Sequence, residues 1–210
     1  MTTIMLVRHG NTDWNVQEIF RGRADIPLNK TGTKQANFLA KYLEPVAMKA
    51  VYSSPLKRAF ETAEIVAAPH HIDTVPCQEL IDCDFGKWQG LSHDTVKQIY
   101  GAVYSEWLNN PHLTKLPQGE TLDDVRKRVT RLADQIIAQH TGAVVLVSHR
   151  VVHKVLICAL LGLDNSHFWN IRLDTCGITT FAYEKSEFVL VRHNDTSFLK
   201  PLQETRLGDF

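Results

Sequence analysis

Strand-like and helix-like segments alternate along most of this chain. The continuous apolar runs at residues 4–7, within an expected strand at 3–7, and at residues 143–147 are typical of strands that are buried on both faces. Apolar residues spaced as on one side of a helix occur at residues 31–43 and 121–140, the latter with Thr121 as an N-cap. Such an order predicts a three-layer α/β/α sandwich with a mostly parallel central sheet.

The same patterns predict the remaining elements. Gly86 and Gly90 interrupt the stretch 80–90, which we expect to be irregular. The last two strands are expected to form a hairpin or an edge pair. The other expected strands are 50–52, 72–75, 178–183 and 188–191, and the other expected helices are 55–67, with Pro55 in its first turn, 93–108 (one or two helices) and 151–161.

The 210 residues show no internal repeat and no linker-like shift in composition. We therefore expect one domain over residues 1–210, with a helical and irregular segment at about 85–118 that covers the substrate. Lys plus Arg and Asp plus Glu both number 23, so the net charge gives no reason to expect a nucleic-acid or membrane partner.

The first apolar run, residues 4–7, is too short for a signal peptide, so none is expected, and no run approaches the roughly 18 apolar residues of a membrane helix. Its four cysteines form no CxxC pair, which favours free thiols in a reducing compartment. We therefore expect a cytoplasmic protein. The histidines and cysteines lack metal-ligand spacing, so no metal site is expected.

Polar side chains follow three of the expected strands at the point where each one ends. The first strand ends at Arg8-His9, the second is followed by Arg58 one turn into the next helix, and a later one ends at His149. Ligands bind beyond the carboxyl ends of parallel strands, so neighbouring strands would bring these side chains together. Arginine suits phosphate, and histidine can act as nucleophile, acid or base near neutral pH.

Each of these residues also has an ordinary structural interpretation. Arg8 could be a surface charge, and Arg58 could pair with Glu61 along the helix surface. His149 could cap the helix that follows it. Their occurrence together at strand ends is what favours a phosphate site.

The ordered set of motifs resembles the histidine phosphatase superfamily, also called the phosphoglycerate mutase-like family. The resemblance covers most of the chain, and the implied fold is the phosphoglycerate mutase-like α/β sandwich. The matching motifs are residues 6–15 (LVRHGNTDWN), 20–28 (FRGRADIPL) with Gly32, 52–63 (YSSPLKRAFETA), 80–90 (LIDCDFGKWQG), 119–121 (GET) and 145–149 (VLVSH).

The resemblance implies a mechanism. His9 attacks phosphorus and forms a phosphohistidine, and a carboxylic acid at Asp82 protonates the departing oxygen and then activates water. The donors Arg8, Arg58 and His149 stabilise the transferring phosphoryl group, so neither a metal nor another cofactor is required. The further phosphate- or substrate-binding residues that the resemblance implies are Asn15, Arg21, Gly22 and Arg150.

The sequence also departs from the family pattern. The usual acid is glutamate, and Asp82 is one methylene shorter, so Asp84 and Glu79 are alternatives. Arg150 stands where a small residue is common. Arg21 and Arg23 replace more neutral residues, and either lie at the surface or bind a second acidic group on the substrate.

Three functions compete. We favour a phosphatase acting on a small phosphorylated metabolite such as phosphoserine or α-ribazole phosphate, or on a broad range of phosphomonoesters. A cofactor-dependent phosphoglycerate mutase would need a longer basic insertion than residues 91–116 provide. A non-catalytic phosphate-binding module is the third possibility. The edge strand near 178–191 could pair across a homodimer, and the placement of the tail, residues 199–210, is left open.

Overall fold

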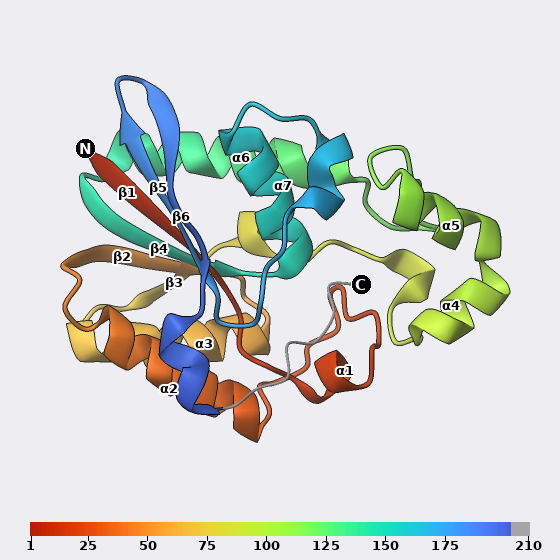
Figure 1. The fold of residues 1–210 in the computed structure, drawn as a ribbon, viewed down its shortest axis with the longest axis horizontal. Helices are drawn as coiled ribbons and strands as arrows, with labels where there is room; N and C mark the ends of the chain where they lie inside the picture. Colours follow the sequence, from red (N-terminus) through yellow and green to blue (C-terminus); the bar gives the residue numbers. More distant parts are fainter. Residues whose placement is uncertain (203–210) are drawn as a thin grey trace.

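A computed structural model of the protein describes residues 1–202 and contains one mixed sheet in the order β3-β2-β4-β1-β5-β6 (Figure 1). The first four strands in this order pair in parallel, whereas β5 pairs antiparallel with both β1 and β6. The strands are β1 (Thr2–Arg8), β2 (Met48–Ser53), β3 (Thr74–Pro76), β4 (Gly142–Ser148), β5 (Ile178–Glu184) and β6 (Glu187–Asp195).

Helices cover both faces of this sheet (Figure 1). Helices α2 (Lys30–Leu43) and α3 (Lys57–Ala67) pack on one face, and α6 (Leu122–Gln139) and α7 (Arg150–Leu160) on the other. Successive side chains of a strand point to opposite faces. Leu6 therefore belongs to the core beneath α6 and α7, and Val7 to the core beneath α2 and α3. The predicted three-layer sandwich with a mostly parallel sheet is confirmed.

The stretch 85–118 extends to one side of the sheet (Figure 1). It contains α4 (His93–Ile99) and α5 (Gly101–Asn109), which correspond to the one or two helices expected there. The buried side chains of Trp88 and Trp107 pack this stretch against the core formed with α6 and α7. The remaining elements of residues 1–202 are α1 (Asp13–Val16) and five short 3-10 helices, η1 (Ala68–His70), η2 (Gln78–Leu80), η3 (Gly86–Trp88), η4 (Asn165–Asn170) and η5 (Ser197–Leu202).

Helix starts follow the capping chemistry of the sequence in one case and depart from it in another. Thr121 caps α6 in a reciprocal capping box with Asp124, as predicted. The predicted start of α3 at Pro55 is wrong, because the N-cap is Leu56 and its backbone is extended. The extended backbone of Leu56, with ψ at 135°, keeps Pro55 outside the helix, and α3 begins at Lys57.

The C-terminal part returns along the sheet as an antiparallel β5–β6 hairpin, which confirms the expected pair. Leu199 in η5 then packs into the core beneath α2 and α3. Residues 203–210 of the tail lie outside the described part of the chain. Within residues 1–202, none of the helices combines the length and the apolar character needed to span a bilayer.

Candidate active site

The candidate site lies at the carboxyl ends of three adjacent parallel strands. Arg8 at the end of β1 is in register with Ser148 at the end of β4, and Ser53 of β2 is in register with Val147. The residues that follow these strands therefore emerge side by side. Parallel pairing thus brings together the polar residues whose convergence was expected from the sequence.

Two buried imidazoles face each other at this edge. The ring centroids of His9 and His149 are 5.3 Å apart, and each residue is only 1% exposed. The backbone N–H of His9 donates to the carbonyl oxygen of Ser148 at 3.0 Å, which fixes one strand end against the other. The two histidines therefore lie together, as was expected from the strand ends.

The surroundings of His9 determine which ring nitrogen carries a proton. Its Nδ1 lies 2.6 Å from the carbonyl oxygen of Gly10, and because a carbonyl only accepts, Nδ1 donates. Nε2 therefore carries the lone pair. Burial, followed by the charges of Arg58 and Arg8, lowers the pKa of His9 well below its usual value. The ring is thus neutral near pH 7, as a nucleophile must be.

His149 has polar neighbours at both ring nitrogens. Its Nε2 lies 2.7 Å from the Ser54 hydroxyl, and its Nδ1 lies 3.5 Å from Oδ2 of Asp82. Burial, followed by the charge of Arg58, lowers the pKa of His149 as well. His149 occupies the N-cap position of α7 but makes no side-chain cap hydrogen bond, so the alternative capping role is wrong.

Arg58 and Asp82 form a buried ion pair next to the histidines. Nη2 of Arg58 lies 2.9 Å from Oδ2 of Asp82, and the side chains are 0% and 7% exposed. Burial lowers the pKa of Arg58, whereas the charge of Asp82 raises it. The alternative pairing of Arg58 with Glu61 is wrong, because Glu61 instead accepts the N–H of Leu28. Asp82 is therefore brought to the site, as the resemblance implied.

Arg58 also holds the loop that follows α1. Its Nη2 donates to the carbonyl of Gly22 at 2.7 Å, and its Nη1 donates to the carbonyl of Ala24 at 2.8 Å. Gly22 has a φ of +50°, and a Cβ there would lie 2.2 Å from Oε1 of Gln89. Glycine adopts this conformation without the cost that a Cβ would add, and it leaves room for the Gln89 side chain. The loop that carries Arg21 and Gly22 is thus placed against the ion pair.

Further arginines surround the same point. Arg8 is 8% exposed and its Nη1 donates to the carbonyl of Leu173 at 2.5 Å, so it is not a surface charge. Arg21 is half-buried, and burial together with the charges of Arg8, Arg150 and Arg58 lowers its pKa. Mutual depression of this kind requires cations that lie close together, which is the arrangement expected of an anion site.

Asn15 is positioned by the capping box of α1. Its Oδ1 accepts from the backbone N–H and the hydroxyl of Thr12 at 3.0 and 2.8 Å. These bonds identify Oδ1 as the inward acceptor, so the rest of the amide, Nδ2, is a donor group. A donor is what an anion requires.

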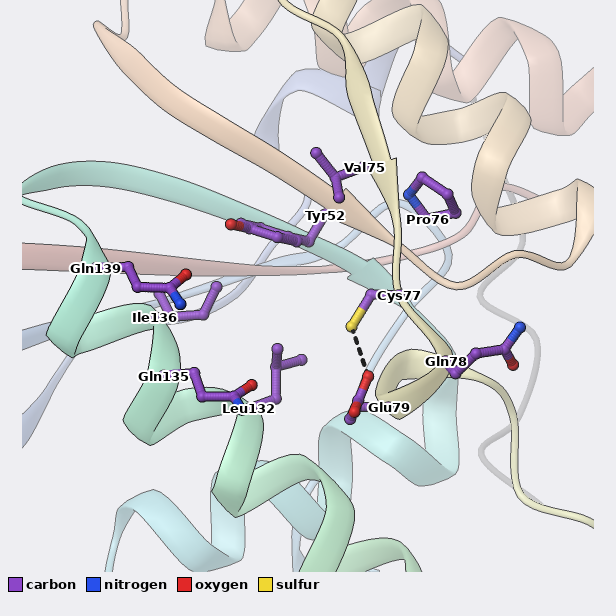
Figure 2. Close-up of a pocket in the computed structure, with 10 residues that line it drawn as sticks. All are labelled: Tyr52, Val75, Pro76, Cys77, Gln78, Glu79, Leu132, Gln135, Ile136 and Gln139. Atoms are coloured by element: carbon purple, nitrogen blue, oxygen red, sulfur yellow. Dashed lines mark hydrogen bonds between the residues drawn. The ribbon is translucent and has the colours of Figure 1, made fainter.

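The two alternative acids, Asp84 and Glu79, bind partners other than Arg58 and His149. Asp84 accepts the N–H of Gly86 at 2.8 Å and pairs with Arg23 at 3.4 Å. Glu79 accepts from the thiol of Cys77 at 3.2 Å, which lowers the pKa of the carboxyl. It lines a separate cavity of about 410 Å³ beside β2, β3 and α6 (Figure 2). Asp82 is the carboxylate that contacts both Arg58 and His149.

Sequence reasoning missed the partners that hold this site. It gave no role to Ser54, which contacts His149, although a serine after a strand was a usable signal. Arg23 is exposed, as one of its two expected roles required, but its ion pairs with Asp84 and Glu120 were not predicted. Within residues 1–202, no cluster of three or more His, Cys, Asp or Glu side chains could hold a metal ion.

Comparisons with known proteins identify the family of the chain. The family model of the histidine phosphatase superfamily (branch 1) matches residues 4–196. Phosphoserine phosphatase 1 of Hydrogenobacter thermophilus is 32% identical over 95% of both chains. The adenosylcobalamin/alpha-ribazole phosphatase of Escherichia coli is 31% identical over 81% of this chain and 85% of its own.

Solved structures show the same fold. YhfR of Bacillus stearothermophilus superposes with a TM-score of 0.90 at 32% identity, over 95% of this chain and all of its own. The family match spans nearly the whole chain, including the segments that carry the two histidines, the arginines and Asp82. The chain therefore belongs to the histidine phosphatase superfamily, and it is a phosphatase of that type.

Proposed function

We propose that the protein hydrolyses a small phosphomonoester through a phosphohistidine at His9, without a metal ion. The observation that carries this proposal is the orientation of His9. Its Nδ1 is fixed on Gly10, its Nε2 carries the lone pair, and its lowered pKa keeps the ring neutral. No other imidazole in the site has this arrangement, because both nitrogens of His149 face polar side chains.

The residues around His9 supply the other functions that the reaction needs. Nε2 of His9 attacks phosphorus while the bond to the ester oxygen breaks, and Asp82 gives that oxygen its proton. Arg8, Arg58 and His149, with the Asn15 amide, stabilise the charge on the transferring group. Asp82 then takes a proton from water, which attacks the phosphohistidine and releases inorganic phosphate.

Phosphatase activity is favoured over mutase activity by the segment between Gly90 and Pro117. A mutase must hold a second acidic group and shield the phosphoenzyme from water. The basic residues of this segment, apart from histidine, are Lys97 and Lys115. The two short helices α4 and α5 fill it instead.

We expect the purified protein to release phosphate from p-nitrophenyl phosphate and from phosphoserine at an undiminished rate in EDTA. The arginines would then supply the charge stabilisation for which other phosphoryl-transfer enzymes use Mg²⁺. Phosphate release is measured colorimetrically with and without chelator. Interconversion of 3- and 2-phosphoglycerate that outpaces phosphate release would instead identify a mutase. Phosphate binding without any turnover would identify a binding module.

Among candidate substrates, we propose one that bears a carboxylate near the phosphate, as phosphoserine does. The charge of Arg150 acts on Arg21 and on His93, and burial followed by Arg150 and Arg21 lowers the pKa of His93 to about 4. Arg21 and Arg150 thus extend the positive field beyond the phosphate arginines. Phosphoserine is also the substrate named for the Hydrogenobacter relative, whereas the E. coli relative is named for alpha-ribazole.

Replacement of Arg150 tests this choice. We expect R150Q to lower kcat/KM for phosphoserine by about 10-fold, the value of one charge-assisted hydrogen bond. For phosphoethanolamine, which lacks only the carboxylate of phosphoserine, the same substitution should lower kcat/KM by less than about 3-fold. R172Q removes a half-exposed arginine and serves as the matched control. Equal losses on both substrates would assign Arg150 to the phosphate, and no loss on either would remove it from the site.

The predicted single domain, the cytoplasmic location and the homodimer stay predictions. The four cysteines are all buried free thiols, which suits the proposed reducing compartment. α-Ribazole phosphate belongs in the same substrate screen as the second candidate.

A further inference from the structure

Glu120 lies at the centre of an ionic network beside the proposed acid. Its Oε1 lies 3.1 Å from Nη2 of Arg23, and its Oε2 lies 3.3 Å from Nη2 of Arg128. The same Oε2 accepts the backbone N–H of Asp84 at 3.0 Å, and the backbone N–H of Glu120 donates to the carbonyl of Asp84 at 2.8 Å. One carboxylate thus joins three segments that are distant in the sequence.

Arg128 connects this network to the backbone on both sides of the acid segment. From α6 its Nη1 donates to the carbonyl of Glu79 at 2.5 Å, and its Nη2 lies 3.4 Å from the carbonyl of Asp82. The Arg128 side chain is only 12% exposed, so these contacts are shielded from water. Ser148 at the end of β4 holds the intervening carbonyl of Leu80 at 2.6 Å. The acid segment is therefore held through its main chain.

Arg23 connects the network to the loop at residues 22–24, whose carbonyl groups bind Arg58. It pairs with both Glu120 and Asp84, while the carbonyls of Gly22 and Ala24 on either side accept from Arg58. The loop at 22–24 and the segment at 82–84 are consequently linked twice. The inner link is the Arg58–Asp82 ion pair, and the outer link is Arg23 with Glu120.

We propose that Glu120 is a positioning residue for Asp82, acting through Arg128 and the backbone of Asp84. The proposal rests on the function proposed above, in which Asp82 is the acid. Aspartate has one rotatable bond fewer than glutamate, so the place of its carboxylate depends more directly on its backbone. Misplacement of a catalytic group by about 1 Å can cost about 100-fold in rate. A shorter acid therefore needs a backbone that is firmly held.

Substitution E120Q keeps the shape of the side chain but removes its charge. The amide offers one acceptor in place of two, so Arg23, Arg128 and the N–H of Asp84 cannot all be satisfied. We expect kcat for phosphoserine, whose alkoxide leaving group needs a proton, to fall about 10-fold with KM within about 2-fold. The burst of p-nitrophenol from p-nitrophenyl phosphate should change less than about 3-fold, because p-nitrophenolate leaves without a proton.

A double-mutant cycle separates positioning from general loss of structure. If Glu120 acts through Asp82, then E120Q adds nothing to the loss of phosphoserine turnover already present in D82N. The conservative variant E120D retains the charge and should recover part of the rate. D124N serves as the control, because Asp124 is an exposed carboxylate in the first turn of α6 that forms its capping hydrogen bonds with Thr121. It should keep the wild-type rate.

Each failure has its own signature. Multiplicative losses in the cycle, or equal losses of burst and turnover in E120Q, would overturn the positioning role while leaving the phosphatase intact. A wild-type protein that releases no phosphate from either substrate would overturn the proposed function itself. Thermal unfolding of every variant is measured alongside. If E120Q is unfolded at the assay temperature, R128K takes its place in the cycle, because lysine retains the charge of Arg128 but has a single donor group.

Discussion

The variant H9A should lose at least about 10⁴-fold in turnover while it still binds inorganic phosphate or vanadate. Loss of the nucleophile removes the covalent route altogether, and effects of this size are typical of such a loss. The anion should still bind because Arg8 and Arg58 are held by backbone carbonyls and by Asp82 rather than by His9. Turnover is measured as phosphate release, and binding as protection against thermal unfolding.

The identity of the phosphorylated histidine can be tested directly. Rapid acid-sensitive labelling from radioactive substrate should disappear in H9A and persist, with slower formation, in H149Q. The two rings are 5.3 Å apart, so a label on the wrong one is a real alternative. Labelling that survives in H9A but is lost in H149Q would reverse the roles.

In the wild-type protein, formation of the phosphohistidine label should have a pH dependence that follows from the burial of His9. Burial and the arginines lower the pKa of His9, so the folded ring takes up a proton only at a pH below that of an ordinary histidine. Label formation should therefore continue at pH 5.5, where an exposed histidine is mostly protonated. A loss of labelling centred near pH 6.5 would show that His9 titrates as an exposed group.

Much of the fold could be predicted because its signals are local and strong. The runs at β1 and β4 and the periodicity of α2 and α6 are each long enough to identify their element. The four residues of α1 are too few to show a period, so the helix that positions Asn15 was not predicted. The start of α3 was misplaced because proline fixes only its own φ, whereas the next residue, Leu56, has an extended backbone.

The site residues that could be predicted are those that lie at strand ends or within the family motifs. Parallel strands bring their carboxyl ends to one edge, which is why His9 and His149 could be expected together. The partner of Arg58 could not be read in this way. A residue three positions along the helix, Glu61, is the local candidate, whereas the actual partner, Asp82, is supplied by a segment that only the tertiary fold brings near.

The variant D82N should lower turnover of phosphoserine at least about 100-fold, with little change in phosphate affinity. The amide can neither give a proton to the leaving oxygen nor take one from water. Its shape still fits between Arg58 and His149, so the arrangement of the anion site should survive. Turnover and product inhibition by phosphate are measured on the same preparation.

The choice of leaving group then separates the two tasks of Asp82. With p-nitrophenyl phosphate the first step needs no proton, so D82N should give a burst of p-nitrophenol close to one equivalent per site, followed by slow release of phosphate. With phosphoserine the first step is itself impaired, so no burst of serine is expected. The controls D84N and E79Q remove carboxylates that are bound to Gly86 and Cys77, and turnover lost in either one but kept in D82N would transfer the acid to that residue.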